Sequence, residues 1–173
     1  MPESHRARSI GYNWFRVFVT TLDGSRVIAT TSIVPTVYDI ASGKAFSLAG
    51  LPSDNNDFFD KAGASDNSEG SMRSLAQRLK LQCWEIYDCG NRQFVVPMTV
   101  TQQGSTPAER WLVYKYDMSG APRARLEFGS GSEYGVVKYV SYSARNDMIL
   151  AFALSKTDGW SLLFMKWAWS DEG

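Results

Sequence analysis

The residues that could carry out acid–base or nucleophilic chemistry are few in this chain. His5 is the single histidine, and it lies in an N-terminal stretch, residues 1–12, that reads as a flexible arm. Histidine is the commonest general base and the commonest metal ligand. A Ser-His-Asp or Cys-His site would therefore need this arm to fold back, and the sequence contains no nucleophile-elbow or Walker-type motif. We predict no enzyme of these classes and no cofactor.

The two cysteines, Cys83 and Cys89, do not predict a disulfide or a metal site. They flank the run Trp-Glu-Ile-Tyr-Asp, and if that run is extended their Cα atoms lie about 20 Å apart, which is beyond disulfide reach. A zinc site needs more ligands than two thiolates without a histidine. This cysteine usage fits a reducing compartment, so we expect a cytoplasmic protein.

Carboxylates are the remaining catalytic candidates. Paired Asp and Glu residues hydrolyse glycosidic bonds without histidine, so a carboxylate-dependent hydrolase stays open as an alternative function. No spacing among the acidic residues defines such a pair. The residues concerned lie on or near expected strands: Glu85, Asp88, Glu109, Asp117, Glu127 and Glu133.

Two groups of aromatic residues are candidates for binding a partner. In the first, Asp57, Phe58, Phe59 and Asp60 follow one another in an acidic loop. An apolar pair flanked by acids can enter a pocket of a partner while the acids steer a basic surface. The alternative is that both phenylalanines pack back onto the core and hold the loop in place.

The second group is formed by Trp160, Trp167 and Trp169 in the C-terminal strand. On a regular strand, Trp167 and Trp169 share one face and Trp160 lies on the other. Exposed tryptophans stack on a sugar ring or bury in a partner protein. Packing within the core is the alternative for this group.

Strand signals fill most of the chain. The dipeptide Asp23-Gly24 between two apolar runs is a strong hairpin cue, and similarly short turns separate the later runs. Parallel neighbours need long crossovers, so these short links predict an antiparallel arrangement. Pro97 marks an edge strand or a bulge. We expect about eleven strands, at residues 14–20, 26–34, 36–40, 45–48, 83–88, 92–100, 110–117, 123–128, 135–143, 148–155 and 160–169.

Two of these strands have an unusual pattern. Residues 148–155 and 160–169 are almost continuously apolar, which is typical of strands that are buried on both faces. We therefore expect both to lie centrally in the fold.

One segment interrupts the strands. Residues 49–71 form a long acidic loop, and loops of this length are usually functional or disordered. Residues 71–82 are the one predicted helix, because Met72, Leu75 and Leu79 recur on a single helical face. We expect an all-β fold with this one short helix, in a single domain over residues 13–173.

A short recurring pattern bears on the architecture. Tyr-Asp, a short spacer and Gly occur at residues 38–43, 87–90 and 116–120, and this resembles the outer hairpin of a β-propeller blade. The intervals between the three copies are unequal, which argues against a true repeat. A propeller-like arrangement and a sandwich or barrel both remain open.

The composition argues against several classes of partner. The chain has 173 residues, with 18 basic and 18 acidic side chains and zero formal charge, so we expect no nucleic-acid ligand. No stretch approaches the roughly 20 apolar residues of a membrane span. With little catalytic equipment and many aromatics, we predict a soluble, non-catalytic protein-binding module: an adaptor, an inhibitor or immunity-type protein, or a subunit of a larger assembly. A lectin-like carbohydrate-binding protein is the other alternative, and a homo-oligomer is compatible with either.

Overall fold

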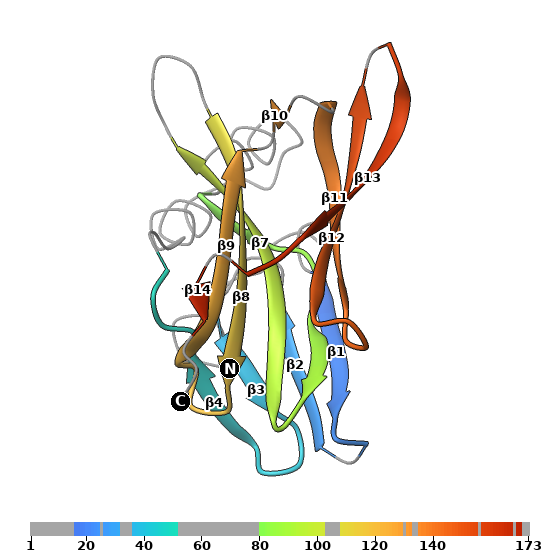
Figure 1. Ribbon diagram of the computed structural model, residues 1–173. Helices are drawn as coiled ribbons and strands as arrows, with labels where there is room; N and C mark the ends of the chain where they lie inside the picture. The colour runs from blue at the N-terminus through green and yellow to red at the C-terminus, as the bar shows by residue number, and fades with distance from the viewer. Residues whose placement is uncertain are drawn as a thin grey trace, which may run out of the picture.

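Antiparallel strands make up the fold (Figure 1). In the computed structural model the described residues form fourteen strands in three sheets, and they contain no helix. The predicted all-β class is therefore confirmed. The structure describes residues 16–24, 26–31, 36–51, 80–102, 108–129, 131–132, 135–155, 157–167 and 169–170.

The first sheet is a four-stranded meander in the order β1-β2-β3-β4. Asp23 and Gly24 both have positive φ, 48° and 71°, and they lie in the short connection between the paired residues Leu22 and Arg26. This confirms the hairpin predicted from that dipeptide. The strands are β1 (Val17–Leu22), β2 (Arg26–Thr31), β3 (Thr36–Asp39) and β4 (Lys44–Ser47).

The second sheet lies between the other two, and we call it the central sheet. Its strands follow the order β14-β9-β8-β7-β5, and β6 also pairs with β7. Its strands are β5 (Leu81–Cys83), β6 (Tyr87–Gly90), β7 (Gln93–Gln102), β8 (Ala108–Asp117), β9 (Pro122–Gly129) and β14 (Trp169–Ser170).

The third sheet is another antiparallel meander, in the order β10-β11-β12-β13. Its register shifts once, between Val137 and Tyr139 of β11, which is a bulge. Its strands are β10 (Gly131–Ser132), β11 (Gly135–Ser143), β12 (Met148–Ser155) and β13 (Gly159–Met165).

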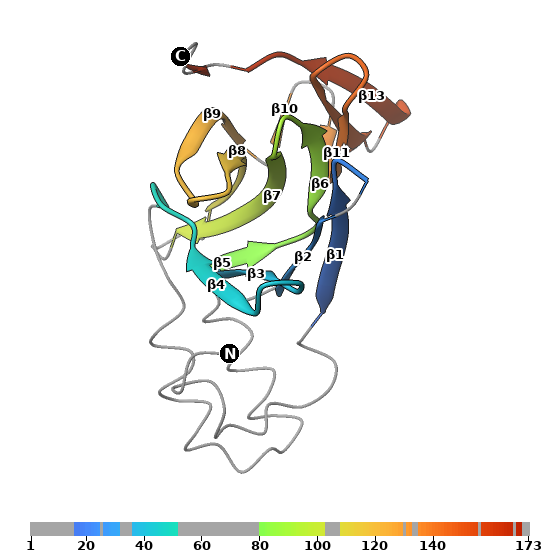
Figure 2. The same ribbon diagram turned by 90° about the horizontal axis from the view of Figure 1, so that it is seen from below.

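The core has two parts, one on each face of the central sheet. Phe94, Val96 and Met98 of β7 pack with residues of the first sheet, whereas Val95 packs with residues of the third sheet. Seen from below, β1–β4 and β11–β13 lie on opposite sides of β7 (Figure 2). The described strands are thus stacked as in a sandwich, and their pairing shows no closed barrel or propeller ring.

The strands at the centre of the fold are β7 and β8, and not the two apolar strands predicted at residues 148–155 and 160–169. Every described side chain from Phe94 to Val100 is buried, because β7 has a strand on each side and a sheet against each face. The prediction that residues 160–169 lie centrally is wrong. β13 is the last strand of the third sheet, and it ends at Met165 before the chain crosses to pair Trp169 with Arg125 in the central sheet.

Pro97 lies in β7 and therefore not in an edge strand. Its carbonyl accepts the Trp84 N–H at 3.0 Å, so its missing N–H also faces that side of the strand. There β5 ends at Cys83 and β6 begins only at Tyr87. The interruption lies in the neighbouring strand, so the absent donor removes no ladder bond.

Part of the predicted helix is a strand. Leu81 and Cys83 are buried and pair with Val100 and Met98 of β7, and this pairing covers the edge of β7. Residues 71–79 lie outside the described ranges, as do the predicted arm at 1–12 and residues 52–70 of the acidic loop. Among the described residues, no helix is long and apolar enough to span a membrane.

Candidate functional site

The β12–β13 hairpin carries the candidate site, and a short local motif builds its turn. Gly159 has φ of 77°, a conformation that glycine adopts without strain. Just before it, the Ser155 hydroxyl oxygen accepts the N–H groups of Thr157 and Asp158 at 3.2 and 3.3 Å. This turn fixes which residues of the two strands stand opposite each other.

The hairpin register places apolar residues side by side on one face of the third sheet. Ile149, Ala151 and Ala153 point into the core, so the alternate residues of β12 point away from it. Three cross-strand pairs then lie next to one another on the outward face: Leu154 with Trp160, Phe152 with Leu162, and Leu150 with Phe164.

The side chains on this face are well exposed. Trp160 and Phe164 are each 64% exposed and Leu162 is 44% exposed. Nine large apolar residues are exposed in the described chain, and six of them belong to this face. We name these six the outer apolar face: Val136, Tyr139, Leu154, Trp160, Leu162 and Phe164.

The outer apolar face is large and uncharged. We estimate its exposed area at roughly 600 Å², the upper end of what monomers usually expose. Tyr139 lies at its margin, where its hydroxyl is 3.1 Å from that of Tyr87 and its ring centroid is 6.2 Å from that of Phe152. Apolar patches of this size are often functional, so this face is the candidate contact surface.

β13 is also an unguarded edge strand. One of its edges pairs with β12, and the other pairs with no strand among the described residues. Its seven residues include no charge and no proline, and its register with β12 has no bulge. Proteins usually protect sheet edges with these devices, and the other described sheet-end strands are shorter, with β1 the longest at six residues.

The sequence-predicted tryptophans have different positions. Trp160 belongs to the outer apolar face. Trp167 packs on Tyr142 with ring centroids 6.3 Å apart, donates its indole N–H to Asp147 at 3.1 Å, and lies under the Lys115 ammonium group. Trp169 has its backbone in β14, and its side chain is outside the described part.

The other predicted site is not described, and part of the observed one was missed. Asp57, Phe58, Phe59 and Asp60 lie outside the described ranges. The sequence interpretation singled out Trp160 but missed the other five residues of the outer apolar face. An apolar residue at every second position of β13 is the signal that could have identified Leu162 and Phe164. That signal is hidden because the residues between them are mostly apolar as well.

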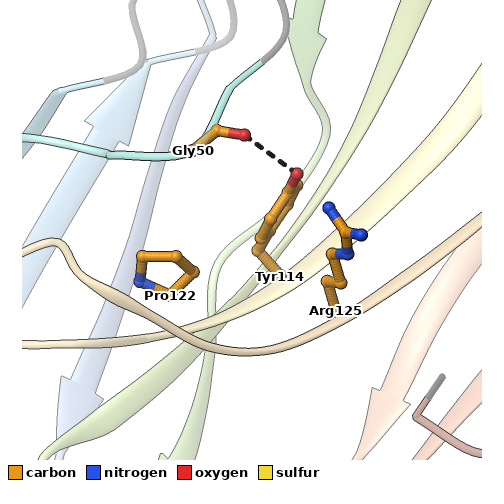
Figure 3. Close-up of a pocket in the computed structure, with 4 residues that line it drawn as sticks. All are labelled: Gly50, Tyr114, Pro122 and Arg125. Atoms are coloured by element: carbon orange, nitrogen blue, oxygen red, sulfur yellow. Dashed lines mark hydrogen bonds between the residues drawn. The ribbon is translucent and has the colours of Figure 1, made fainter. Parts of the chain in front are cut away.

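One hollow lies where the segment after β4 crosses the central sheet. A cavity of about 160 Å³ is lined by Gly50, Tyr114, Pro122 and Arg125. Figure 3 shows the Tyr114 ring between Pro122 and the Arg125 guanidinium group. The Tyr114 hydroxyl donates to the Gly50 carbonyl at 3.0 Å, so the tyrosine already holds the crossing segment in place.

The second hollow is polar and has a volume of about 590 Å³. Asp117 lines it and accepts bonds from Ser119, Ala121 and Arg123. Burial raises the pKa of Asp117, but these hydrogen bonds outweigh burial and lower it to about 2. Because its oxygens are engaged by its own turn, Asp117 is poorly placed to act as a general base.

The wall of this hollow is strained at Arg92. Arg92 has φ of 58°, which is uncommon for a long side chain, and its N–H donates to the Asp23 carboxylate at 3.1 Å. This bond joins the β1–β2 turn to the β6–β7 turn. The polar groups of this hollow therefore hold two turns together.

The described residues offer no metal centre, since no three His, Cys, Asp or Glu side chains among them are grouped to share an ion. The comparisons give no family. The chain matches no protein-family model, no curated protein and no solved structure.

Proposed function

We propose that the protein is a non-catalytic binding module that docks another polypeptide on β13 and the outer apolar face. The observation that carries the proposal is the exposure of Trp160, Leu162 and Phe164 on a strand with an unguarded edge. An adaptor, an inhibitor or a subunit of an assembly would use such a surface.

The chemistry of the partner follows from the two parts of the site. The edge of β13 that pairs with no described strand offers backbone N–H and C=O groups to an incoming strand, and the face beside it offers apolar contacts. Addition of a strand to a sheet edge combines these two kinds of recognition. We therefore expect an extended segment with apolar side chains at alternate positions.

A carbohydrate ligand is less favoured by the same surface. A sugar needs hydrogen-bonding side chains beside the aromatic ring on which it stacks. The residues beside Trp160 within the outer apolar face are Leu154, Val136 and Leu162, which offer no polar side-chain atom. The nearest polar side chain is that of Asp158, and its carboxylate already accepts bonds from the Ser155 and Thr157 hydroxyl groups. The described surroundings of Trp160 thus match a polypeptide better than a glycan.

The proposal is tested by affinity capture from native extract with matched variants. Trp160→Ser with Phe164→Ser should reduce the captured partner by about tenfold or more, because both aromatic anchors are lost. Val17→Ser with Val19→Ser removes two exposed apolar side chains from β1 and serves as the control.

The melting temperature of each variant is measured alongside capture. Retention of the partner by the β13 variant would show that this surface is not the docking site. Equal loss of capture in both variants would show that capture depends on nonspecific hydrophobic contacts and not on β13.

A further inference from the structure

The exposed side of β13 has nearly the same pattern in both directions. Trp160 and Phe164 flank Leu162 at equal distances along the strand, and all three are exposed on the same face. Two antiparallel copies of β13 with a two-fold axis at Leu162 would place Trp160 of one copy opposite Phe164 of the other. Both ends then gain an aromatic cross-strand pair, which is among the favourable pairings in sheets.

The charges beyond the two ends of β13 match in the same register. Asp158 precedes the strand and Lys166 follows it, and both are exposed. The axis at Leu162 brings the turn residue Asp158 of one copy to the same end of the paired strands as Lys166 of the other, and it does so twice. Opposite charges therefore meet at each end of the paired strands.

Neighbouring registers lose these aromatic and charge pairings. Moving the axis to Ser161 places Asp158 opposite Phe164, and moving it to Leu163 places Trp160 opposite Lys166. In a two-fold interface, residues near the axis meet their own copies, so a charge in the middle of β13 would meet a like charge. β13 carries none, and Leu162 meets Leu162.

We infer that the partner of β13 is a second copy of this chain, joined through antiparallel β13 strands about a two-fold axis at Leu162. The two third sheets become one continuous eight-stranded sheet, and neither copy leaves its β13 edge open. This inference rests on the proposed function, because it names the occupant of the β13 edge in the same docking surface.

Charge reversal tests the register in the full chain. The molar mass of the wild type is measured by sedimentation between about 0.1 and 100 µM, and we expect a dimer that forms with rising concentration. Asp158→Lys or Lys166→Asp alone should weaken the dimer about tenfold, because each places like charges together at both ends.

The double variant provides the rescue. Asp158→Lys combined with Lys166→Asp exchanges the two charges and should restore the wild-type dimerisation constant. A wild type that stays monomeric throughout the concentration range overturns the inference. So does a dimer that the single reversals leave unchanged.

Crosslinking tests the axis independently. Leu162→Cys places two thiols opposite each other, with Cβ atoms about 4.5–5.5 Å apart, so mild oxidation should give a covalent dimer. Leu154→Cys lies on the same face but on β12, and its copy would be more than three strand spacings, or over ~14 Å, away, because the two positions are also offset along the strands. Covalent dimer from Leu154→Cys and none from Leu162→Cys would contradict edge-to-edge pairing, and the wild type shows the background from Cys83 and Cys89.

The failure of this inference differs from the failure of the proposed function. If the wild type is monomeric but Trp160→Ser with Phe164→Ser still abolishes capture of another protein, the second copy is the wrong occupant and the docking surface stands. If neither dimerisation nor capture responds to these two substitutions, both are wrong.

Discussion

At the residue scale, Asp147 joins the third sheet to the central sheet. Its carboxylate accepts bonds from Lys115 at 2.8 Å, Tyr142 at 2.7 Å and Trp167 at 3.1 Å. Burial raises its pKa, but these three donors outweigh burial and lower it. Lys115 belongs to β8, so one turn residue organises contacts across two layers.

Replacing Asp147 should therefore cost stability. Asp147→Ala loses the bonds from three donor side chains and places alanine at φ of 48°, and we expect the free energy of unfolding to fall by about 1–2 kcal/mol. Asp147→Asn should cost less, because asparagine tolerates this φ and keeps an acceptor. Urea unfolding followed by tryptophan fluorescence measures both, with the exposed Arg145→Ala in the same turn as the control. Equal losses of unfolding free energy in Asp147→Ala and Arg145→Ala would contradict the proposed contribution of Asp147.

Stability in acid should depend on Asp117, another carboxylate whose pKa is lowered by hydrogen-bond donors. The pKa of Asp117 is about 2 in the folded chain against an ordinary value of 3.8. A depressed folded pKa contributes stability that is complete above the unfolded value and is lost as pH falls through the folded value. We expect the free energy of unfolding to decrease between about pH 4 and pH 2, and less steeply in Asp117→Asn. A variant that keeps the full wild-type slope would show that Asp117 does not contribute.

The acidic aromatic cluster gives a prediction from the sequence alone. Phe58→Ala with Phe59→Ala should weaken capture of a partner and leave the melting temperature nearly unchanged, because an exposed pair adds little to the core. A fall of many degrees would show instead that the two rings are core residues.

At the element scale, turns were more predictable than the layers that strands occupy. Asp23-Gly24 and Asp158-Gly159 give hairpins because their backbone preferences are local. The place of β13 depends on which faces the other sheets cover, and this is not a local property. The residues of β13 fit a doubly buried strand as well as an edge strand, so Trp160 could be singled out from the sequence but Leu162 and Phe164 could not.

The packing of the β8–β9 turn against β4 gives a prediction about an element. Gly120 has φ of 82°, and a Cβ there would lie 2.3 Å from the Ser47 carbonyl oxygen. Gly120→Ala should therefore lower the free energy of unfolding by about 3 kcal/mol or more, since backbone must move. Gly43 has φ of 66° with nothing within 4 Å of its Cβ position, so Gly43→Ala should cost only about 1 kcal/mol. Similar losses by urea unfolding would show that the close approach is not important.

At the scale of the whole molecule, three stacked sheets produce very different surroundings for their strands. β7 and β8 have a strand on each side and a packed layer against each face. Within the described part of the chain, β13 has one neighbouring strand and an exposed outer face. Since the same stacking buries the middle layer and exposes β13, the stable core and the proposed docking surface have one structural cause.

Hydrogen exchange of the backbone amides tests this arrangement directly. At low protein concentration, amides of β13 should exchange through local opening, about 100-fold or more faster than those of β7 and β8, which need global unfolding. Raising the concentration should protect β13 and leave β7 and β8 unchanged, because pairing between copies engages only the free edge. In Lys166→Asp this added protection should be much weaker at the same concentration. If β13 were as protected as β7 in dilute protein, β13 could not be an open edge, and both the docking surface and the layer order would have to be reconsidered.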